Sequence, residues 1–241
     1  MEGHLGIPKK VLYRLYVAAV TEFSLSKSLL RSPHRGDLTA VQEATIRLLS
    51  EDELTSVILL TNPDHNTALN RRKDLISDGS LDPSSELILN GHVLGVAKNS
   101  KASLLWHHRR WLLKHLYGGG KERMNQEADS LHNVTVPTEQ LIAEFALCAK
   151  GAALYRRNYH AWAHRFKCLE SLKSSLPGRA TEDIAILVQE HAEVRSWVES
   201  NVTDHTAMQY LCRVDEVCRR TGGNGVIQGE GYAQMMYAVS H

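Results

Sequence analysis

The sequence has no excess of either charge, no paired cysteine motif and no long hydrophobic run. Its 241 residues include 28 Lys or Arg and 27 Asp or Glu, which gives a formal net charge of +1. This balance argues against a general nucleic-acid-binding protein, because such proteins need a clearly basic surface. The four cysteines are scattered without a CxxC pair, so we expect reduced thiols rather than disulfides or metal ligands.

Targeting and membrane-spanning segments are also missing from the sequence. The start, MEGHLGIPKK, lacks the apolar run that follows the charged residues of a secretory signal. No stretch approaches the roughly 18 consecutive apolar residues that a membrane-spanning helix needs. We therefore expect a cytoplasmic protein without a membrane span.

Strand-like alternation of apolar and polar residues is hardly seen, and helical periodicity takes its place. One stretch has five residues at offsets of 0, 4, 7, 8 and 11, which share a helix face: Leu12, Tyr16, Ala19, Val20 and Phe23. The same offsets recur between residues 141 and 152. Short polar breaks separate such stretches, and the longest break spans residues 118–136. The pattern predicts an all-α protein.

Four segments of the sequence align without gaps and reveal an internal repeat. A large apolar residue occupies the centre of each copy: Leu69, Trp106, Trp162 and Met208. Three residues later, the first three copies carry Arg72, Arg109 and Arg165, whereas the fourth copy has Leu211. The centres lie 37, 56 and 46 residues apart. A basic unit of this length, with insertions, fits two helices and their turns.

Each repeat is predicted to be a helical hairpin whose second helix carries the central residue and the arginine. A single hairpin cannot bury its own apolar face, so neighbouring hairpins are expected to stack into a right-handed α–α superhelix with a concave surface. A tryptophan and an arginine three residues apart share one helix face. We expect seven residues to form the structural core of the repeats: Leu69, Arg72, Trp106, Arg109, Trp162, Arg165 and Met208.

Breaks in the pattern divide the chain into three parts. Residues 1–38 are predicted to hold an N-terminal helix and a linker, and residues 39–220 about four helical hairpins. After Arg220 the sequence becomes rich in glycine and loses its apolar period. Residues 221–241 are therefore predicted to form an irregular tail.

Two clusters near Trp106 have alternative interpretations. His107, His108 and His115 lack the spacing of a zinc motif, so we expect structural or surface residues. The second cluster is basic and consists of Arg109, Arg110, Lys114 and Lys121. We expect a solvated helix face there, with an acidic partner surface or a diphosphate as the alternative.

The two strongest copies of the repeat resemble a known family. The segments KASLLWHHRRWLL (101–113) and NYHAWAHRFKCL (158–169) are similar to the (N/K)-x-Y-x-x-W-x-H-R signature of protein prenyltransferase α subunits. The resemblance extends over residues 40–215. Tetratricopeptide repeats differ in consensus and have a period of about 34 residues. Within the family, the chain resembles the α chain of a third, type III-like geranylgeranyltransferase, which shares its β subunit with the Rab enzyme.

The resemblance implies a crescent of hairpins wrapped around a catalytic prenyltransferase β subunit. In such a heterodimer the zinc, the isoprenoid pocket and the activated thiolate belong to the β subunit, so no cofactor or metal is expected in this chain. By motif position, Lys101 corresponds to the family's lysine beside the prenyl diphosphate. Asn158, Tyr159 and His160 correspond to its Asn-Tyr-His group. All four residues are implied at the partner interface, where Lys101, Tyr159 and His160 assist catalysis on the diphosphate side.

The chemistry of prenyl transfer supports these implied roles. Transfer to a cysteine thiolate builds negative charge on the departing diphosphate, and fixed cations and hydrogen-bond donors lower that barrier. The family usually has a tyrosine two residues after the lysine, whereas this sequence has Ser103, whose hydroxyl is too short to replace a phenol. Ser103 and the degenerate end repeats favour an alternative function, a non-enzymatic helical-repeat adaptor for protein–protein interaction.

Overall fold

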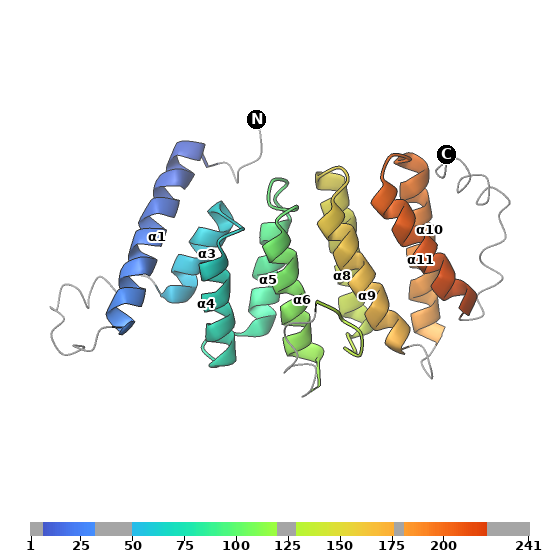
Figure 1. Cartoon of the computed structure of the whole chain (residues 1–241), viewed down its shortest axis with the longest axis horizontal. Helices are drawn as coiled ribbons and strands as arrows, with labels where there is room; N and C mark the ends of the chain where they lie inside the picture. Colours follow the sequence, from blue (N-terminus) through green and yellow to red (C-terminus); the bar gives the residue numbers. More distant parts are fainter. Residues whose placement is uncertain (1–6, 32–49, 120–128, 176–180, 221–241) are drawn as a thin grey trace.

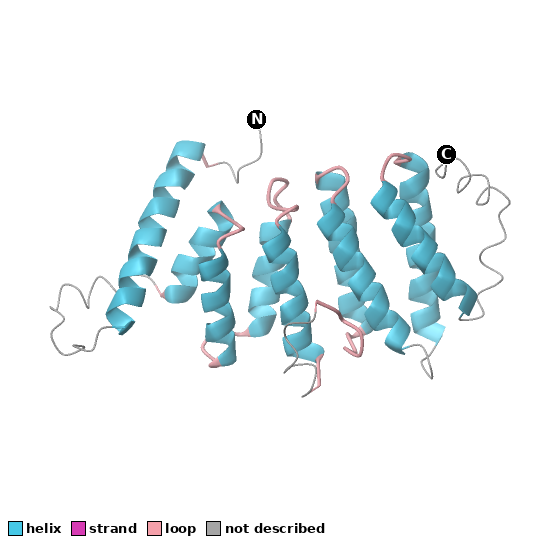
Figure 2. Ribbon diagram, in the orientation of Figure 1, coloured by secondary structure: helices cyan, strands magenta, loops and turns pink. Residues whose placement is uncertain are grey.

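In the computed structural model, every regular element of the described chain is an α-helix (Figures 1 and 2). The structure describes residues 7–31, 50–119, 129–175 and 181–220. The helices are α1 (Lys9–Arg31), α3 (Glu51–Thr61), α4 (Asn66–Ser77), α5 (Pro83–Leu94), α6 (Ser103–Tyr117), α8 (Thr138–Leu154), α9 (Tyr159–Ser175), α10 (Thr181–Ser200) and α11 (His205–Arg220). No strand occurs within these ranges, which confirms the predicted all-α fold class.

The helices form hairpins that stack in a single row. Packing joins α3 to α4, α5 to α6, α8 to α9 and α10 to α11, and Figure 1 shows these pairs side by side along the long axis of the molecule. The second helix of each pair lies on the nearer side in this view, with the first helix behind it. Helix α1 packs against α3 at one end of the row. The predicted array of helical hairpins is therefore confirmed.

Capping residues that can be read from the sequence define where two of the first helices begin. Ser50 and Glu53 form a capping box at the start of α3, in which each side chain accepts a hydrogen bond from the other residue's backbone N–H. At the start of α5, Asp82 accepts a hydrogen bond from the backbone N–H of Ser85, and Pro83 occupies the first turn. These caps satisfy backbone donors that the helices themselves leave unpaired.

The hydrophobic core runs along the row between the two layers of helices. Its buried side chains fall into two clusters. Trp106 lies in the cluster that includes residues of α1, α3, α4 and α5, and Trp162 lies in the cluster that includes residues of α10 and α11. The two tryptophans expose 0% and 2% of their surface. Stacking neighbouring hairpins thus buries the apolar stripe that one hairpin leaves open.

Some predicted features lie outside the described residues. They include the linker at residues 32–38 and the tail at residues 221–241, so the predicted division into three parts stays a prediction. Of the longest predicted break, residues 118–119 and 129–136 are described, and none of them is helical. Among the described helices, none combines the length and the hydrophobicity needed to cross a membrane.

Candidate functional site

The three arginines of the repeat motif are buried between neighbouring hairpins. Arg72, Arg109 and Arg165 expose only 1%, 5% and 2% of their surface. A guanidinium group stays charged inside a protein, so a buried arginine needs a carboxylate and hydrogen-bond acceptors around it. The partners of these three arginines therefore determine how the hairpins are held together.

The prediction of a solvated basic face on α6 is wrong. Arg109, Arg110 and Lys114 are all buried, and Lys121 lies outside the described residues. Arg110 donates two hydrogen bonds to the Asp129 carboxylate, at 2.5 and 2.9 Å. Carboxylates from other parts of the chain, rather than water, surround these arginines.

Arg109 of α6 is held by a carboxylate from the next hairpin. Its guanidinium donates to both oxygens of Glu144 in α8, at 2.6 and 2.7 Å. The Nε2 atom of His164 in α9 lies 2.8 Å from Oε2 of the same carboxylate. Burial alone would raise the pKa of Glu144, but the charge of Arg109 and the hydrogen bond with His164 lower it to about 2. An ionised Glu144 thus ties α6 to both helices of the following hairpin.

The same arrangement occurs one repeat earlier. Arg72 of α4 donates to Oε2 of Glu86 in α5, at 2.7 and 2.5 Å. The Nε2 atom of His108 in α6 lies 2.8 Å from the other oxygen of that carboxylate. His108 and His164 each stand two residues after the central residue of their repeat. An arginine, a glutamate and a histidine therefore form one recurring unit between hairpins.

The next unit keeps the ion pair but changes the third residue. Arg165 of α9 donates to both oxygens of Glu190 in α10, at 2.6 and 2.7 Å. The hydroxyl of Tyr210 donates to Oε1 of Glu190 at 2.5 Å, from the position that histidine occupies in the other units. The last repeat has Leu211 in place of the arginine. We call these three units, centred on Glu86, Glu144 and Glu190, the charge ladder.

Sequence analysis identified the arginines of the charge ladder but missed its carboxylates. Glu86, Glu144 and Glu190 precede the central residue of their own repeat by 20, 18 and 18 residues. Their separations from the arginines that they bind are irregular, at 14, 35 and 25 residues. The spacing between each glutamate and the following central residue is the signal that could have found them.

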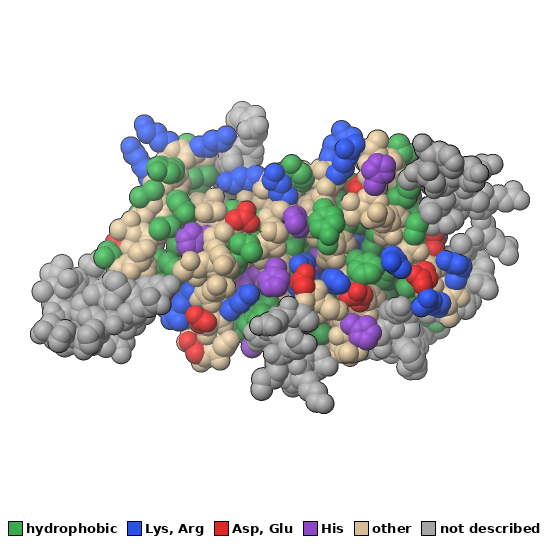
Figure 3. Space-filling model, viewed as in Figure 1, with side chains coloured by type: hydrophobic (Ala, Val, Ile, Leu, Met, Phe, Trp, Pro, Cys, Tyr) green, Lys and Arg blue, Asp and Glu red, His purple; other side chains and the backbone are tan. Residues whose placement is uncertain are grey.

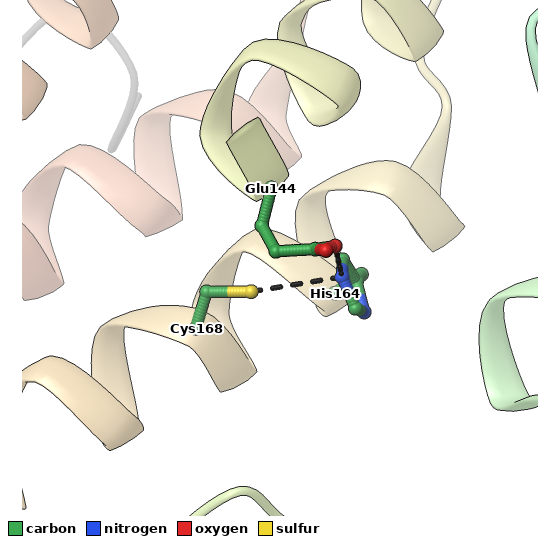
Figure 4. Close-up of side chains that lie close together, drawn as sticks. All are labelled: Glu144, His164 and Cys168. Atoms are coloured by element: carbon green, nitrogen blue, oxygen red, sulfur yellow. Dashed lines mark hydrogen bonds and ion pairs between the residues drawn. The ribbon is translucent and has the colours of Figure 1, made fainter. Parts of the chain in front are cut away.

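Glu144, His164 and Cys168 lie close enough together to be tested as a metal site (Figure 4). Their potential ligand atoms lie within 4.8 Å of one another, and Cys168 Sγ is 3.6 Å from His164 Nε2. However, Arg109 already binds both oxygens of Glu144, and its positive charge opposes a cation there. Burial also raises the pKa of the Cys168 thiol, which disfavours a thiolate ligand. These residues fit a structural unit rather than a metal site.

The two histidines of the charge ladder predict a pH-dependent stability. Burial lowers the pKa of both His108 and His164 below the unfolded value of about 6.5, against the opposing effect of Glu86 and Glu144. The unfolded chain therefore binds more protons, so stability is complete above about pH 6.5 and falls as the pH decreases, by at most about 1.4 kcal/mol per pH unit for each histidine. Urea denaturation between about pH 7.5 and 5.5 measures this slope.

Arg72, Lys73, Arg109 and Arg110 also act on these histidines and further oppose their protonation. A variant with His108→Gln and His164→Gln keeps side-chain N–H donors near the carboxylates but removes both titrating groups. Its stability is expected to change much less over the same pH range. An unchanged slope in this variant would show that other groups cause the dependence.

The indole of Trp106 and the amide of Asn158 meet at one backbone carbonyl. Trp106 Nε1 donates to the carbonyl of Ser100 at 2.7 Å, and Asn158 Nδ2 donates to the same oxygen at 2.8 Å. Asn158 Oδ1 accepts a hydrogen bond from the Ala161 backbone N–H, as an N-cap residue does. Asn158 is 1% exposed, so its side chain cannot make the implied partner contact. It instead holds the turn before α6 against the start of α9.

The other three implied site residues are accessible at the starts of adjacent second helices. Lys101 is exposed in the turn before α6, and Tyr159 and His160 begin α9. Tyr159 is 63% exposed, and its ring meets that of the half-buried His160 edge-on at 5.5 Å. Partial burial lowers the pKa of His160, which favours the neutral imidazole. The bond between Asn158 and Ser100 joins these two helix starts.

A phenol that sequence analysis did not single out lies beside Lys101. The hydroxyl of Tyr155, at the end of α8, is 3.3 Å from Lys101 Nζ, which lies 4.8 Å from the centre of the tyrosine ring. The two residues are 54 positions apart, so no local pattern could have paired them. Tyr155 thus brings a phenol to Lys101 from the next hairpin, whereas Ser103 cannot provide one from the same helix.

A groove of about 720 Å³ opens between α9 and α11. Its lining combines aromatic and basic side chains, among them Tyr159, Trp162, Phe166, Lys167, Tyr210 and Arg213. Lys167 and Arg213 pair with Glu170 and Glu216 on their own helices. The groove therefore offers a mainly apolar surface next to the start of α9.

A protein-family model, described as protein prenyltransferase alpha subunit repeat, matches residues 141–172. These residues run from α8 into α9 and contain Glu144, Trp162, His164 and Arg165. The chain carries a prenyltransferase alpha subunit repeat. The resemblance stated from the W-x-H-R segments is thereby confirmed. In the prenyltransferase alpha subunit repeat of this chain, His164 belongs to the charge-ladder unit centred on Glu144, and Arg165 belongs to the next unit, centred on Glu190.

Known proteins with the same repeat are similar over much of the chain. The chain is 33% identical over 161 residues to "Protein prenyltransferase alpha subunit repeat-containing protein 1" of Danio rerio, and 35% identical over 170 residues to the Homo sapiens protein of that name. These matches cover 66% and 67% of this chain but only 36% and 39% of the two relatives. "Geranylgeranyl transferase type-2 subunit alpha" of Bos taurus is 31% identical over 120 residues, or 47% of this chain and 18% of the relative. Over about half of its length, the chain is thus similar to a geranylgeranyl transferase α subunit.

Proposed function

We propose that this chain is the α subunit of a heterodimeric protein prenyltransferase that transfers a geranylgeranyl group to a protein cysteine. The observation that carries the proposal is the prenyltransferase alpha subunit repeat, in which Tyr159 and His160 stand accessible beside the turn of Lys101. The similarity to a geranylgeranyl transferase subunit supports the choice of prenyl group. The proposed partner is a β subunit like that of the Rab enzyme, which would hold the zinc and the isoprenoid pocket.

In the proposed reaction, the substrate's thiolate sulfur forms a bond to C1 of the prenyl chain while the bond from C1 to the diphosphate oxygen breaks. Negative charge therefore accumulates on the departing diphosphate. Lys101 would offer an ammonium group, Tyr159 a phenol and His160 an imidazole N–H toward that charge. Donors fixed before the reaction stabilise such charge without reorganising during the step.

Tyr155 extends this proposed set of donors. Its hydroxyl and Lys101 Nζ are 3.3 Å apart, so an anion that reaches the ammonium can also approach the phenol. Lys101 Nζ also lies over the Tyr155 ring, and this cation–π contact favours the position beside the phenol. Tyr155 would then have the role of the family tyrosine that is absent at Ser103.

Substitution of Lys101 tests the proposal on the complex with the β subunit. Lys101→Ala is expected to lower kcat by about 100- to 1,000-fold, because it removes a fixed donor from the developing charge. Tyr155→Phe is expected to lower kcat by about tenfold, the equivalent of one hydrogen bond to a charged group. Single-turnover prenyl transfer to a cysteine-bearing protein measures both effects.

Lys98→Ala provides a matched control, because Lys98 is an exposed lysine in the same turn as Lys101. Its complex is expected to keep kcat within about twofold, a difference of roughly 0.4 kcal/mol in the barrier. If Lys101→Ala and His160→Ala both leave transfer at the level of the control, the proposed diphosphate role is wrong.

A non-enzymatic adaptor is the second candidate function, and the groove between α9 and α11 favours it. Its aromatic lining suits an apolar side chain of a protein partner, and binding there would need no catalytic group. The Lys101→Ala and His160→Ala variants discriminate between the two functions. A complex that binds the β subunit and transfers the prenyl group equally well with and without these side chains uses this chain as a scaffold.

A further inference from the structure

Helix α1 carries a largely apolar stripe beside the face that packs against α3. We call it the outer stripe, and its five positions are Val11, Leu15, Ala18, Glu22 and Leu25. Each position precedes by one residue a position of the stripe that packs against α3, so it lies about 100° around the helix from it. Val11, Leu15 and Leu25 expose 44%, 45% and 48% of their surface, and Ala18 is also exposed. Figure 3 shows apolar side chains along α1 at the left end of the row.

The spacing of the outer stripe is that of a helix packed along another helix. Its positions follow one another at intervals of four, three, four and three residues. Side chains at these intervals form one narrow line on the helix, which is the seam of paired helices. The outer stripe therefore suits a second helix better than a loop or an extended segment.

The two ends of the row differ in what they expose. Terminal repeats of a stacked array need a polar outer face to stay soluble. Helix α11 meets this requirement: none of its residues is an exposed large hydrophobic side chain, and its exposed positions carry His205, Gln209, Arg213, Arg219 and Arg220. Helix α1 instead exposes five large hydrophobic side chains, three of them in the outer stripe. The α1 end therefore has the character of an interface.

The residues around Ala18 are arranged so that the outer stripe complements itself. Ala18 lies four residues from both Arg14 and Glu22, and seven residues from both Val11 and Leu25. In two copies of α1 packed antiparallel about a twofold axis at Ala18, Arg14 of one copy lies level with Glu22 of the other. Val11 lies level with Leu25 in the same way, and the symmetry makes each contact twice. The small side chain of Ala18 allows a close approach where the helices cross.

Arg14 and Glu22 carry opposite charges that are not used within one copy. Arg14 is exposed and Glu22 is half-buried, and neither forms an ion pair within the described part of the chain. They are eight residues apart, or about 12 Å along the helix, which is too far for them to pair with each other. A parallel arrangement of two copies would place Arg14 beside Arg14 and Glu22 beside Glu22. The charges therefore select the antiparallel arrangement.

We propose that the outer stripe of α1 binds the same stripe of a second copy of this chain, as an antiparallel helix pair centred on Ala18. Helix α1 has 23 residues and is about 34 Å long. One helix face offers less than the roughly 800 Å² per partner of a typical stable interface. We therefore expect a reversible dimer with a Kd on the order of 10 µM. This inference does not depend on the proposed transferase function, since it involves only α1.

Sedimentation equilibrium of the full chain, at concentrations from about 1 to about 200 µM, tests the proposal. The average mass is expected to rise from 27.0 kDa toward twice that value. Arg14→Glu alone or Glu22→Arg alone brings like charges together twice in the dimer and is expected to raise Kd by about tenfold or more. The double variant Arg14→Glu with Glu22→Arg restores opposite charges, so its Kd is expected to stay within about threefold of the unaltered chain.

A second pair of variants tests the position of the twofold axis. Ala18→Arg places a long charged side chain where the two helices cross, and its mass is expected to stay at 27.0 kDa at every concentration. Ala146→Arg is the matched control, because Ala146 is an exposed alanine within α8, away from the outer stripe. The control is expected to dimerise like the unaltered chain. Circular dichroism of all variants confirms that the helices are retained.

Three results would overturn the proposal. One is an unaltered chain that stays at 27.0 kDa over the whole concentration range. Another is a double charge variant that dimerises no better than the single variants, and the third is an equal effect of arginine at positions 18 and 146. If the unaltered chain stays a monomer and Ala18→Arg prevents co-purification with the β subunit, the outer stripe binds that partner instead of a second copy.

Discussion

Replacing Glu144 with leucine is expected to lower the free energy of unfolding by about 3–5 kcal/mol, because the buried Arg109 then loses the carboxylate that binds it through two hydrogen bonds. Glu144 is fully buried and binds Arg109 through two hydrogen bonds, at 2.6 and 2.7 Å. It also holds His164 at 2.8 Å. The change therefore disturbs both contacts between α6 and the next hairpin. Urea denaturation followed by circular dichroism measures the loss.

A paired substitution distinguishes the effect of an unpaired buried charge from the effect of lost packing. Arg109→Met combined with Glu144→Leu removes both charges and is expected to be more stable than Glu144→Leu alone, since no unpaired charge remains. Glu199→Gln is the surface control, because Glu199 pairs with Arg195 in exposed positions and should cost at most about 1 kcal/mol. Equal costs for the single and the paired substitutions would contradict the charge-ladder account.

Replacing Trp106 with alanine is expected to lower the free energy of unfolding by about 3–5 kcal/mol. The side chain is 0% exposed, and its indole N–H donates to the Ser100 carbonyl. A Cβ at Gly151 of α8 would lie 3.2 Å from the indole, which shows how closely the next hairpin packs on it. The substitution therefore opens a cavity between two hairpins. Thermal or urea unfolding detects the lower stability.

The control for Trp106→Ala is Ile88→Ala on the neighbouring helix α5. Ile88 is 62% exposed, so this change should alter stability by no more than about 0.5 kcal/mol. Trp106→Phe removes the indole N–H but keeps much of the ring, and should cost less than the alanine substitution. If alanine at position 106 costs no more than alanine at position 88, the tryptophan does not hold the hairpins together.

Sequence analysis predicted the hairpins because their determinants are local. The apolar stripe that includes Ala19 and Phe23 forms the buried face of α1, and both side chains are buried. The spacing between Trp106 and Trp162 indicates repeating helices, since each repeat must cover the apolar face of its neighbour. Helical period and repeat length are properties of consecutive residues, so one sequence is enough to find them.

The partners of the buried charges could not be predicted in the same way. Arg109 and Arg110 were predicted to lie on a solvated face, because the carboxylates that bind them cannot be recognised from neighbouring residues. These carboxylates, Glu144 and Asp129, lie 35 and 19 residues away in the sequence. Only the stacking of hairpins decides which carboxylate reaches which guanidinium. The pairing of Lys101 with Tyr155 across 54 residues has the same origin.

Asn158 shows that adjacent residues of one motif can differ in exposure and therefore in role. The Asn-Tyr-His group implied three neighbouring contacts with a partner, but successive residues at a helix start point in different directions. Asn158 turns inward to cap α9 and bind the Ser100 carbonyl, whereas Tyr159 turns outward. Only the accessible residues stay candidates for the proposed diphosphate site.

Prenyl transfer by the purified heterodimer is the measurement that tests the central proposal most directly. The full chain is co-expressed with a Rab-type geranylgeranyltransferase β subunit, and the complex is incubated with geranylgeranyl diphosphate and a cysteine-bearing protein. The account predicts a stable one-to-one complex and a substrate mass increased by one geranylgeranyl group. A folded chain that does not co-purify with the β subunit, or a complex that leaves the substrate mass unchanged, would contradict it.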